Sequence, residues 1–186
     1  GQIVGIIGLT GEPSQLQQFG KLVCMTAEMM LEQARLLSML AQDSRLREEL
    51  VLNLIRSETL SSEQSEWAQR LGIDLTVPRV AAVIEIDSGQ LGVNTAIAEL
   101  QQLQNLLNTP EKQNLVATVS LTEIVVLKPA ITNAGQWDSA RLKKQIDTLL
   151  SNMSMSGGLK LRIALGNYFT GSGSIARSYR TACTTL

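Results

Sequence analysis

The residues best suited to chemistry are two acids at the end of an apolar run and a third acid in a turn. The run "RVAAVIEID", residues 79–87, contains Glu85 and Asp87, whose spacing puts both carboxylates on one face of a strand. Glu123 lies in the turn of "NLVATVSLTEIVVLKP", residues 114–129, between two apolar runs. Carboxylate oxygens are typical ligands of Mg²⁺, so these acids could hold a metal ion. We favour the simpler interpretation that Glu85 and Asp87 are exposed residues at a strand end.

The composition restricts the chemistry further. The 186 residues include no histidine, which excludes Ser-His-Asp and Cys-His nucleophile systems and histidine-based zinc sites. The net charge of -1 gives no sign of a DNA-binding surface. Cys24 and Cys183 are typical of reduced, inert thiols, and no apolar run approaches the roughly 18 residues that span a bilayer. We therefore expect a cytoplasmic protein without a membrane partner or a cofactor.

The elements that must position the acids begin with an apolar segment. "QIVGIIGLTG" has the composition of a strand, and such an apolar strand needs neighbours to satisfy its backbone. Nothing nearby in the sequence supplies them. We therefore expect residues 1–12 to be the terminal strand of a domain that lies upstream.

A long helix is predicted for residues 13–57, with Pro13 in its first turn. Apolar residues recur there at alternating spacings of four and three, which is typical of a coiled-coil seam. The members of this seam are Val23, Ala27, Met30, Ala34, Leu37 and Ala41. We interpret the helix as a linker that pairs two copies of the chain as a homodimer. The alternative is an amphipathic helix that packs on its own domain.

The alternating spacing of the seam ends near residue 43, where the helix could break. Asp43 and Ser44 are good N-cap residues, and a new apolar stripe of Leu46, Leu50 and Leu54 follows. Residues 58–77 are then expected to form a short helix and a connector.

The short helix has clear boundaries. Ser61 and Gln64 match a capping box, and Gly72 is a stop signal.

The remaining residues, 78–186, show the order β-α-β-β-α-β-α. This order predicts an α+β fold, a ferredoxin-like antiparallel sheet with helices packed on it. Near the end, the glycine-rich "YFTGSGS" lacks the motif of a phosphate-binding loop. We expect it to cap the last helix through Ser172 or Ser174.

The hairpin and the order of elements resemble the nucleotide cyclases of the GGDEF family. In that family, paired glycines at the hairpin tip let the backbone approach the nucleotide, and acids there and on the first strand hold Mg²⁺. Here the tip reads Ser120, Leu121, Thr122, Glu123, so only Glu123 matches the motif. Glu85 and Asp87 stand where the family tends to carry its first-strand acids.

We interpret this domain as a degenerate, nucleotide-cyclase-like GGDEF module that keeps the shape without the chemistry. It is expected not to be an enzyme, and neither a catalytic residue nor a metal site is assigned. The alternative is a divergent diguanylate-cyclase-like enzyme or a nucleotide-binding module, which would use Glu85, Asp87 and Glu123.

A second resemblance runs from Gly1 to Leu186. The segments "GLTGEP", "CMTAEMMLEQARLL", "LAQDSRLREELVLNLI", "WAQRLGIDL" and "LGNYFTGSGSIARSYRTA" resemble the carbohydrate (sugar) diacid regulators, a bacterial family of transcriptional activators. The resemblance implies a diacid-recognition domain ending with residues 1–12, then a GGDEF-like domain. A helix-turn-helix of the purine-catabolism-regulator type would follow.

The resemblance implies that this chain is the central fragment of an activator for glucarate, galactarate and glycerate utilisation. The sugar diacid would bind the mostly missing N-terminal domain, and DNA would bind the missing C-terminal domain. No ligand-binding residue can be assigned within the chain.

Overall fold

The computed structural model describes residues 5–8, 10–86, 93–108, 113–130, 132–133, 136–140, 142–144, 146 and 161–186. The chain divides into two units, Gly1–Ser44 and Arg45–Leu186. The described residues of the expected first strand, 5–8 and 10–12, are not in a strand, and the rest of that segment lies outside the described residues. Its pairing with an upstream domain stays a prediction.

Helix α1 (Pro13–Arg56) continues through residues 43 and 44, where the sequence left a break open. Asp43 and Ser44 are only moderately unfavourable inside a helix, and good helix formers flank them. The predicted stripe that follows is confirmed, because Leu50 and Leu54 are buried and Leu46 packs against the same core. The end of α1 is therefore part of the folded unit Arg45–Leu186.

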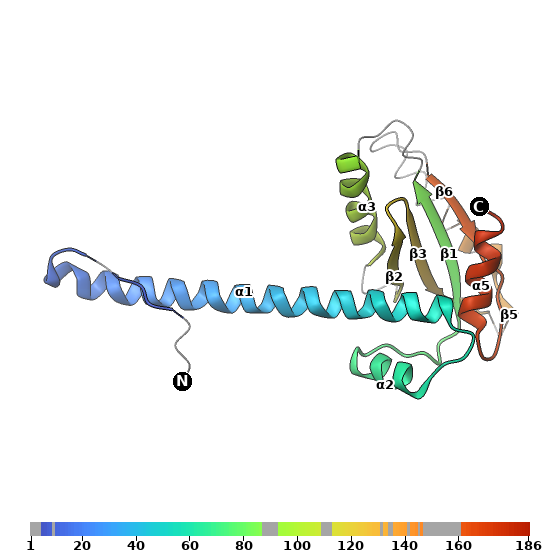
Figure 1. Ribbon diagram of the computed structural model, residues 1–186, viewed down its shortest axis with the longest axis horizontal. Coiled ribbons are helices and arrows are strands. Elements are labelled where there is room, and N and C mark those ends of the chain that lie inside the picture. Colours follow the sequence, from blue (N-terminus) through green and yellow to red (C-terminus); the bar gives the residue numbers. More distant parts are fainter. Residues whose placement is uncertain are drawn as a thin grey trace. The chain divides into compact units, whose positions relative to one another are not determined.

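The predicted antiparallel sheet is confirmed, within a mixed α/β unit (Figure 1). Its order is β2-β3-β1-β6, and every neighbouring pair is antiparallel. The strands are β1 (Arg79–Ile86), β2 (Leu115–Ser120), β3 (Glu123–Pro129) and β6 (Leu161–Leu165). Two short strands that the sequence did not predict, β4 (Thr132–Asn133) and β5 (Gln136–Trp137), pair with each other.

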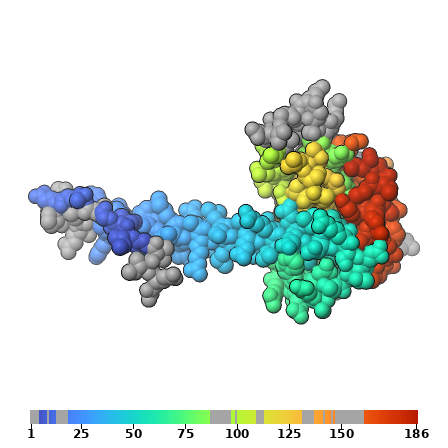
Figure 2. All heavy atoms as spheres, in the orientation of Figure 1, coloured from blue at the N-terminus to red at the C-terminus, as the bar shows by residue number. Residues whose placement is uncertain are grey.

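Among the described residues, helices α2 (Ser62–Arg70), α3 (Val93–Leu107) and α5 (Ser174–Cys183) accompany the sheet, and residues 139–140, 142–144 and 146 are also helical. One face packs on α3 through a core of Ile84, Ile86, Leu100, Leu103, Leu107, Val116, Ile124 and Val126. The opposite face packs on α2 and the end of α1 through Leu50, Val51, Leu54, Ile55, Ala68, Leu71, Ala81, Leu115, Ala117, Val125 and Leu127. Helix α5 lies on this second face, because its Ile175 and Tyr179 pack against the same core, and Figure 2 shows its surface beside that of the end of α1. Successive side chains of a strand point to opposite faces of the sheet and therefore enter two separate cores.

The start of α2 agrees with the sequence. The Ser61 hydroxyl accepts a hydrogen bond from the Gln64 amide, and the Gln64 side chain accepts one from the Ser61 amide. Gly72 has φ +67° directly after the helix, a conformation that favours glycine. Both boundaries follow from local rules.

The start of α5 differs from the prediction, because its N-cap is Gly173 and neither Ser172 nor Ser174. Gly173 has φ +68°, and no side chain caps the helix. The Ser172 hydroxyl instead donates to the carbonyl of Glu58 at 3.1 Å. A Cβ on Gly173 would lie 2.5 Å from that same carbonyl oxygen. The close approach of the two backbones requires glycine at this position.

We expect Gly173→Ala to destabilise the folded unit by about 3 kcal/mol, because it adds a backbone clash to the cost of a left-handed alanine. Gly171→Ala is the matched control, since Gly171 also has positive φ but an added Cβ would meet nothing within 4 Å. The control should cost about 1 kcal/mol. Urea unfolding of both variants measures the difference, and equal losses would show that the Glu58 contact is unimportant.

Candidate functional site

The acids that the sequence singled out lie in one row across the sheet. Glu85 of β1 is directly opposite Glu123 of β3 on one side and Arg162 of β6 on the other. Directly opposed residues of antiparallel strands point to the same face. Two carboxylates and one guanidinium therefore share a face of the sheet, whereas Asp87 lies outside the described residues.

Each of these two acids has a partner within the unit. An oxygen of Glu85 lies 2.6 Å from Nη2 of Arg162. The hydroxyl of Tyr179, on α5, donates to Oε1 of Glu123 at 3.1 Å. Opposed like charges destabilise a strand pair, and these contacts offset that repulsion. The arrangement fits a structural role better than a metal site with open positions.

The hairpin tip is closed by polar contacts and contains no glycine. The pairing of β2 with β3 shifts between Thr118 and Ser120, which is a β-bulge. The Thr122 amide donates to the Ser120 hydroxyl at 3.3 Å, and the Thr122 carbonyl accepts the Ile86 amide at 2.8 Å. Leu121 is exposed at the tip. A side chain therefore stands where the cyclase family brings bare backbone to the nucleotide.

An unpredicted contact supports the bulge from outside the sheet. The carboxylate of Glu48, on α1, accepts a hydrogen bond from the Thr118 amide at 2.7 Å. Strand β2 is an edge of the sheet, so this amide has no strand partner on that side. From the sequence, Glu48 can be identified only as an acidic residue of the long helix. Its contact with the edge strand β2 cannot be predicted, because Thr118 lies 70 residues away along the chain.

Tyr179 is the residue of this site whose ionisation is most perturbed. Burial raises the pKa of its hydroxyl above the ordinary value of 10, and the neighbouring Cys183 and Glu123 raise it further. A raised pKa means that the folded state keeps a proton that the unfolded state releases at alkaline pH. The contribution of Tyr179 to the free energy of unfolding is therefore fully present below about pH 10, and it is lost as the pH rises above that value.

We expect Tyr179→Phe to flatten the alkaline loss of stability while costing about 1 kcal/mol at neutral pH through the lost bond to Glu123. The measurement is the urea midpoint of both proteins from neutral pH to above pH 10. If both midpoints fall in parallel, ionisation of Tyr179 does not cause the loss.

The proposed seam is described entirely within the unit Gly1–Ser44. Its members Val23 and Ala27 are half-buried, and Met30, Ala34, Leu37 and Ala41 are exposed. Larger apolar residues are exposed at positions that the seam omits, namely Phe19, Leu22, Met25, Met29, Leu31, Leu36, Met39 and Leu40. The apolar surface of α1 is thus broader than the seam, and Leu22, Met29 and Leu36 form a second row beside it.

Two absences apply to the described part of the chain. No helix there is both long enough and apolar enough to cross a membrane. Among the same residues, no three acids or cysteines gather closely enough to hold a metal ion.

Comparison with protein families gives two matches that together cover nearly the whole chain. A family described as sugar diacid recognition matches residues 1–54, and a family described as GGDEF-like domain matches residues 56–186. The recognition match extends beyond the terminal strand expected at residues 1–12, into the region predicted as a linker. The GGDEF-like match includes the short helix and connector expected at 58–77.

Comparison with curated proteins agrees with these families. The chain is 65% identical over its whole length to the carbohydrate diacid regulator of Escherichia coli, of which it covers 48%. It is 35% identical, over 81% of its length, to an uncharacterized protein of Haemophilus influenzae, of which it covers 38%. The chain thus spans about half the length, or less, of these relatives.

Proposed function

Because the chain belongs to the GGDEF-like domain family, we propose that it transmits a sugar diacid signal and carries out no cyclase reaction. One observation carries the proposal: the acids that could have held Mg²⁺ are bound to other side chains, Glu85 to Arg162 and Glu123 to Tyr179. The likeness to a carbohydrate diacid regulator supports a regulatory role. The sheet order β2-β3-β1-β6 further supports a ferredoxin-like domain.

The proposal assigns each part of the chain a place in a cytoplasmic transcriptional activator. Residues 1–54 belong to the part that senses glucarate, galactarate or glycerate. Residues 56–186 pass the resulting change to a helix-turn-helix reader of DNA in the remainder of the protein. The net charge of -1 is consistent with a DNA contact that lies elsewhere than in this chain.

Calorimetric titration of the full-length protein with glucarate, galactarate and glycerate tests the sensing role. We expect saturable binding of at least one of these three sugar acids. Succinate serves as a control for dicarboxylates without hydroxyl groups. Absence of binding by all three sugar acids would contradict the proposed signal.

We also expect no turnover of GTP. The full-length protein is incubated with GTP and Mg²⁺, and cyclic dinucleotide is followed by chromatography. Glu123→Ala and Glu85→Ala variants provide the background. Product above this background would restore the diguanylate-cyclase interpretation.

The pairing of two copies through α1 is the second element of the proposal. Exposed Met30 and Leu37 of the seam lie beside exposed Met29 and Leu36 on the same helix. Covering such a surface with a second copy removes apolar area from water, which stabilises a dimer. Regulators that read paired half-sites are commonly two-fold dimers.

A further inference from the structure

We propose that the unit Arg45–Leu186 binds a small anion, through carboxylate or phosphate oxygens, in a pocket beside Arg79 and Arg47. This site is separate from the acid row of the sheet, and one of its lining residues, Arg47, lies within residues 1–54, which match the diacid-recognition family. The proposal does not depend on the regulatory function proposed above.

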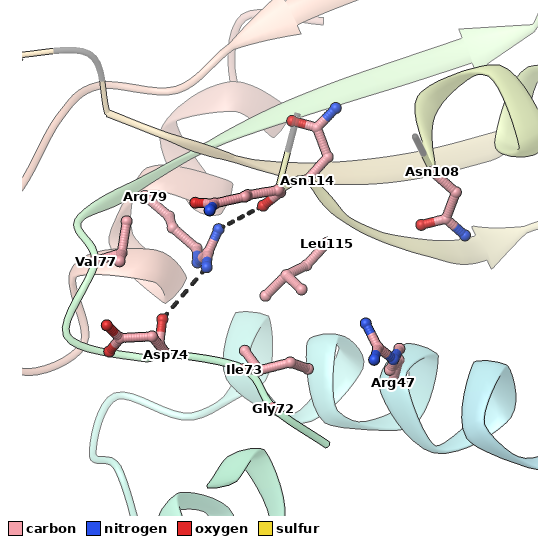
Figure 3. Close-up of a pocket in the computed structure, with 10 residues that line it drawn as sticks. Arg47, Gly72, Ile73, Asp74, Val77, Arg79, Asn108, Asn114 and Leu115 are labelled. Atoms are coloured by element: carbon pink, nitrogen blue, oxygen red, sulfur yellow. Dashed lines mark hydrogen bonds between the residues drawn. The ribbon is translucent and has the colours of Figure 1, made fainter. Parts of the chain in front are cut away.

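The pocket has a volume of about 460 Å³, which suits a small polar molecule. Its walls come from the end of α1, the connector between α2 and β1, the residue after α3 and the start of β2 (Figure 3). The polar lining consists of Arg47, Asp74, Arg79, Asn108, Gln113 and Asn114. Two arginines and one aspartate among these residues leave an excess of positive charge.

The burial of Arg79 and its unpaired Nε are the main evidence for a ligand. Only 5% of the residue is exposed, and its hydrogen bonds go to the backbone carbonyls of Gln113 and Asp74, at 2.8 and 3.3 Å (Figure 3). Its Nε is buried without a partner, and no ion pair joins it to a carboxylate of the described residues. A buried cation with an unused donor is costly unless an anion compensates it.

Asp74, the acid in the lining of the pocket, does not fill this role. The Asp74 carboxylate accepts hydrogen bonds from the amide and the hydroxyl of Thr76, at 2.8 and 2.6 Å. Those bonds lower the pKa of Asp74, with a smaller contribution from the Arg79 charge. Burial lowers the pKa of the Arg79 guanidinium, and Asp74 opposes this shift only in part.

Asn114 adds a second buried atom without a partner. The residue is 9% exposed and donates through Nδ2 to the carbonyl of Leu107 at 3.0 Å, whereas its Oδ1 accepts nothing. Its side chain points away from the Arg79 guanidinium (Figure 3), so an anion bound to Arg79 would not satisfy this oxygen. The excess of positive charge from Arg47 and Arg79 favours a small carboxylate or phosphate ligand.

Arg47 offers the means to test the site without disturbing the core. It is exposed, and its Nη2 donates to the Leu71 carbonyl at 3.1 Å. Arg47→Met removes the charge and keeps most of the aliphatic stem. Arg45→Met is the matched control, because Arg45 is an exposed arginine of the same helix that does not line the pocket.

The experiment titrates the full-length protein with inorganic phosphate and, separately, with tartrate, at constant ionic strength against chloride. We expect at least one anion to bind saturably, with a Kd that rises about tenfold in Arg47→Met and is unchanged in Arg45→Met. Phosphate binding alone would identify a phosphate site, and tartrate binding alone a carboxylate site. Asn108→Ala, another exposed change in the lining, should also weaken binding.

The proposal is overturned if neither anion binds saturably. It is also overturned if Arg47→Met and Asn108→Ala bind as wild type does, or if Arg45→Met loses as much affinity as Arg47→Met. Each variant is compared at the same folded fraction, established by far-ultraviolet circular dichroism.

Discussion

Gly166→Ala is expected to destabilise the unit Arg45–Leu186 by about 3–5 kcal/mol, a large part of the stability of an ordinary domain. An added Cβ would lie 2.0 Å from the carbonyl oxygen of Ser178 and 2.7 Å from its hydroxyl oxygen. The first of these atoms is helix backbone, which cannot turn aside as a flexible side chain can. The methyl group would therefore push α5 away from the sheet.

The displacement would also disturb the hydrogen bonds beside this contact. The Gly166 amide donates to the Ala81 carbonyl at 2.8 Å, and the Ala81 amide donates to the hydroxyl of buried Ser178 at 3.0 Å. Urea unfolding measures the loss. Ser178→Ala is the control that removes the hydroxyl without adding a clash, and we expect it to cost about 1–3 kcal/mol. A Gly166→Ala loss no larger than that of Ser178→Ala would contradict the steric account.

Replacing Met30 and Leu37 with glutamate is expected to weaken dimerisation of the full-length protein at least a hundredfold. Each glutamate would be desolvated in the seam opposite like charges, at a combined cost of several kcal/mol. Sedimentation equilibrium compares this variant with wild type. A variant with Arg35→Glu and Gln42→Glu is the matched control, since both residues are exposed on α1 at the same spacing outside the seam.

The neighbouring row provides a further comparison. Met29→Glu with Leu36→Glu places the same charges one residue away, where the side chains are equally exposed. If this pair abolishes dimerisation and the Met30 and Leu37 pair does not, the interface lies on the second row and the seam is wrong. A monomeric wild type at tens of micromolar would exclude an α1 interface altogether.

The parts of the fold that the sequence predicted are those that local rules determine. The Ser61 capping box, the stripe of Leu46, Leu50 and Leu54, and the alternating strands all depend on residues a few positions apart. The break near residue 43 remained undecided because capping propensity and helix continuity compete there with similar strength.

The contacts that define the candidate sites depend on distant pairing. Arg162 reaches Glu85 only because β6 pairs with β1 in one register, and Gly173 is fixed by the backbone of Glu58. Neither partner can be read from spacing along the chain. Arg79 is a charged residue at the start of an apolar strand, which only weakly indicates a buried site. Its hydrogen bonds to the carbonyls of Gln113 and Asp74 depend on the tertiary fold.

The central claim, that diacid binding is passed through α1 to the GGDEF-like domain, is tested most directly by hydrogen exchange. Deuterium uptake of the full-length protein is compared with and without saturating galactarate, or whichever sugar diacid binds. We predict that protection changes extend along α1 and reach β2 and β3, where Glu48 holds the Thr118 amide. Changes confined to residues before α1, with α1 and the sheet unaffected, would contradict the account.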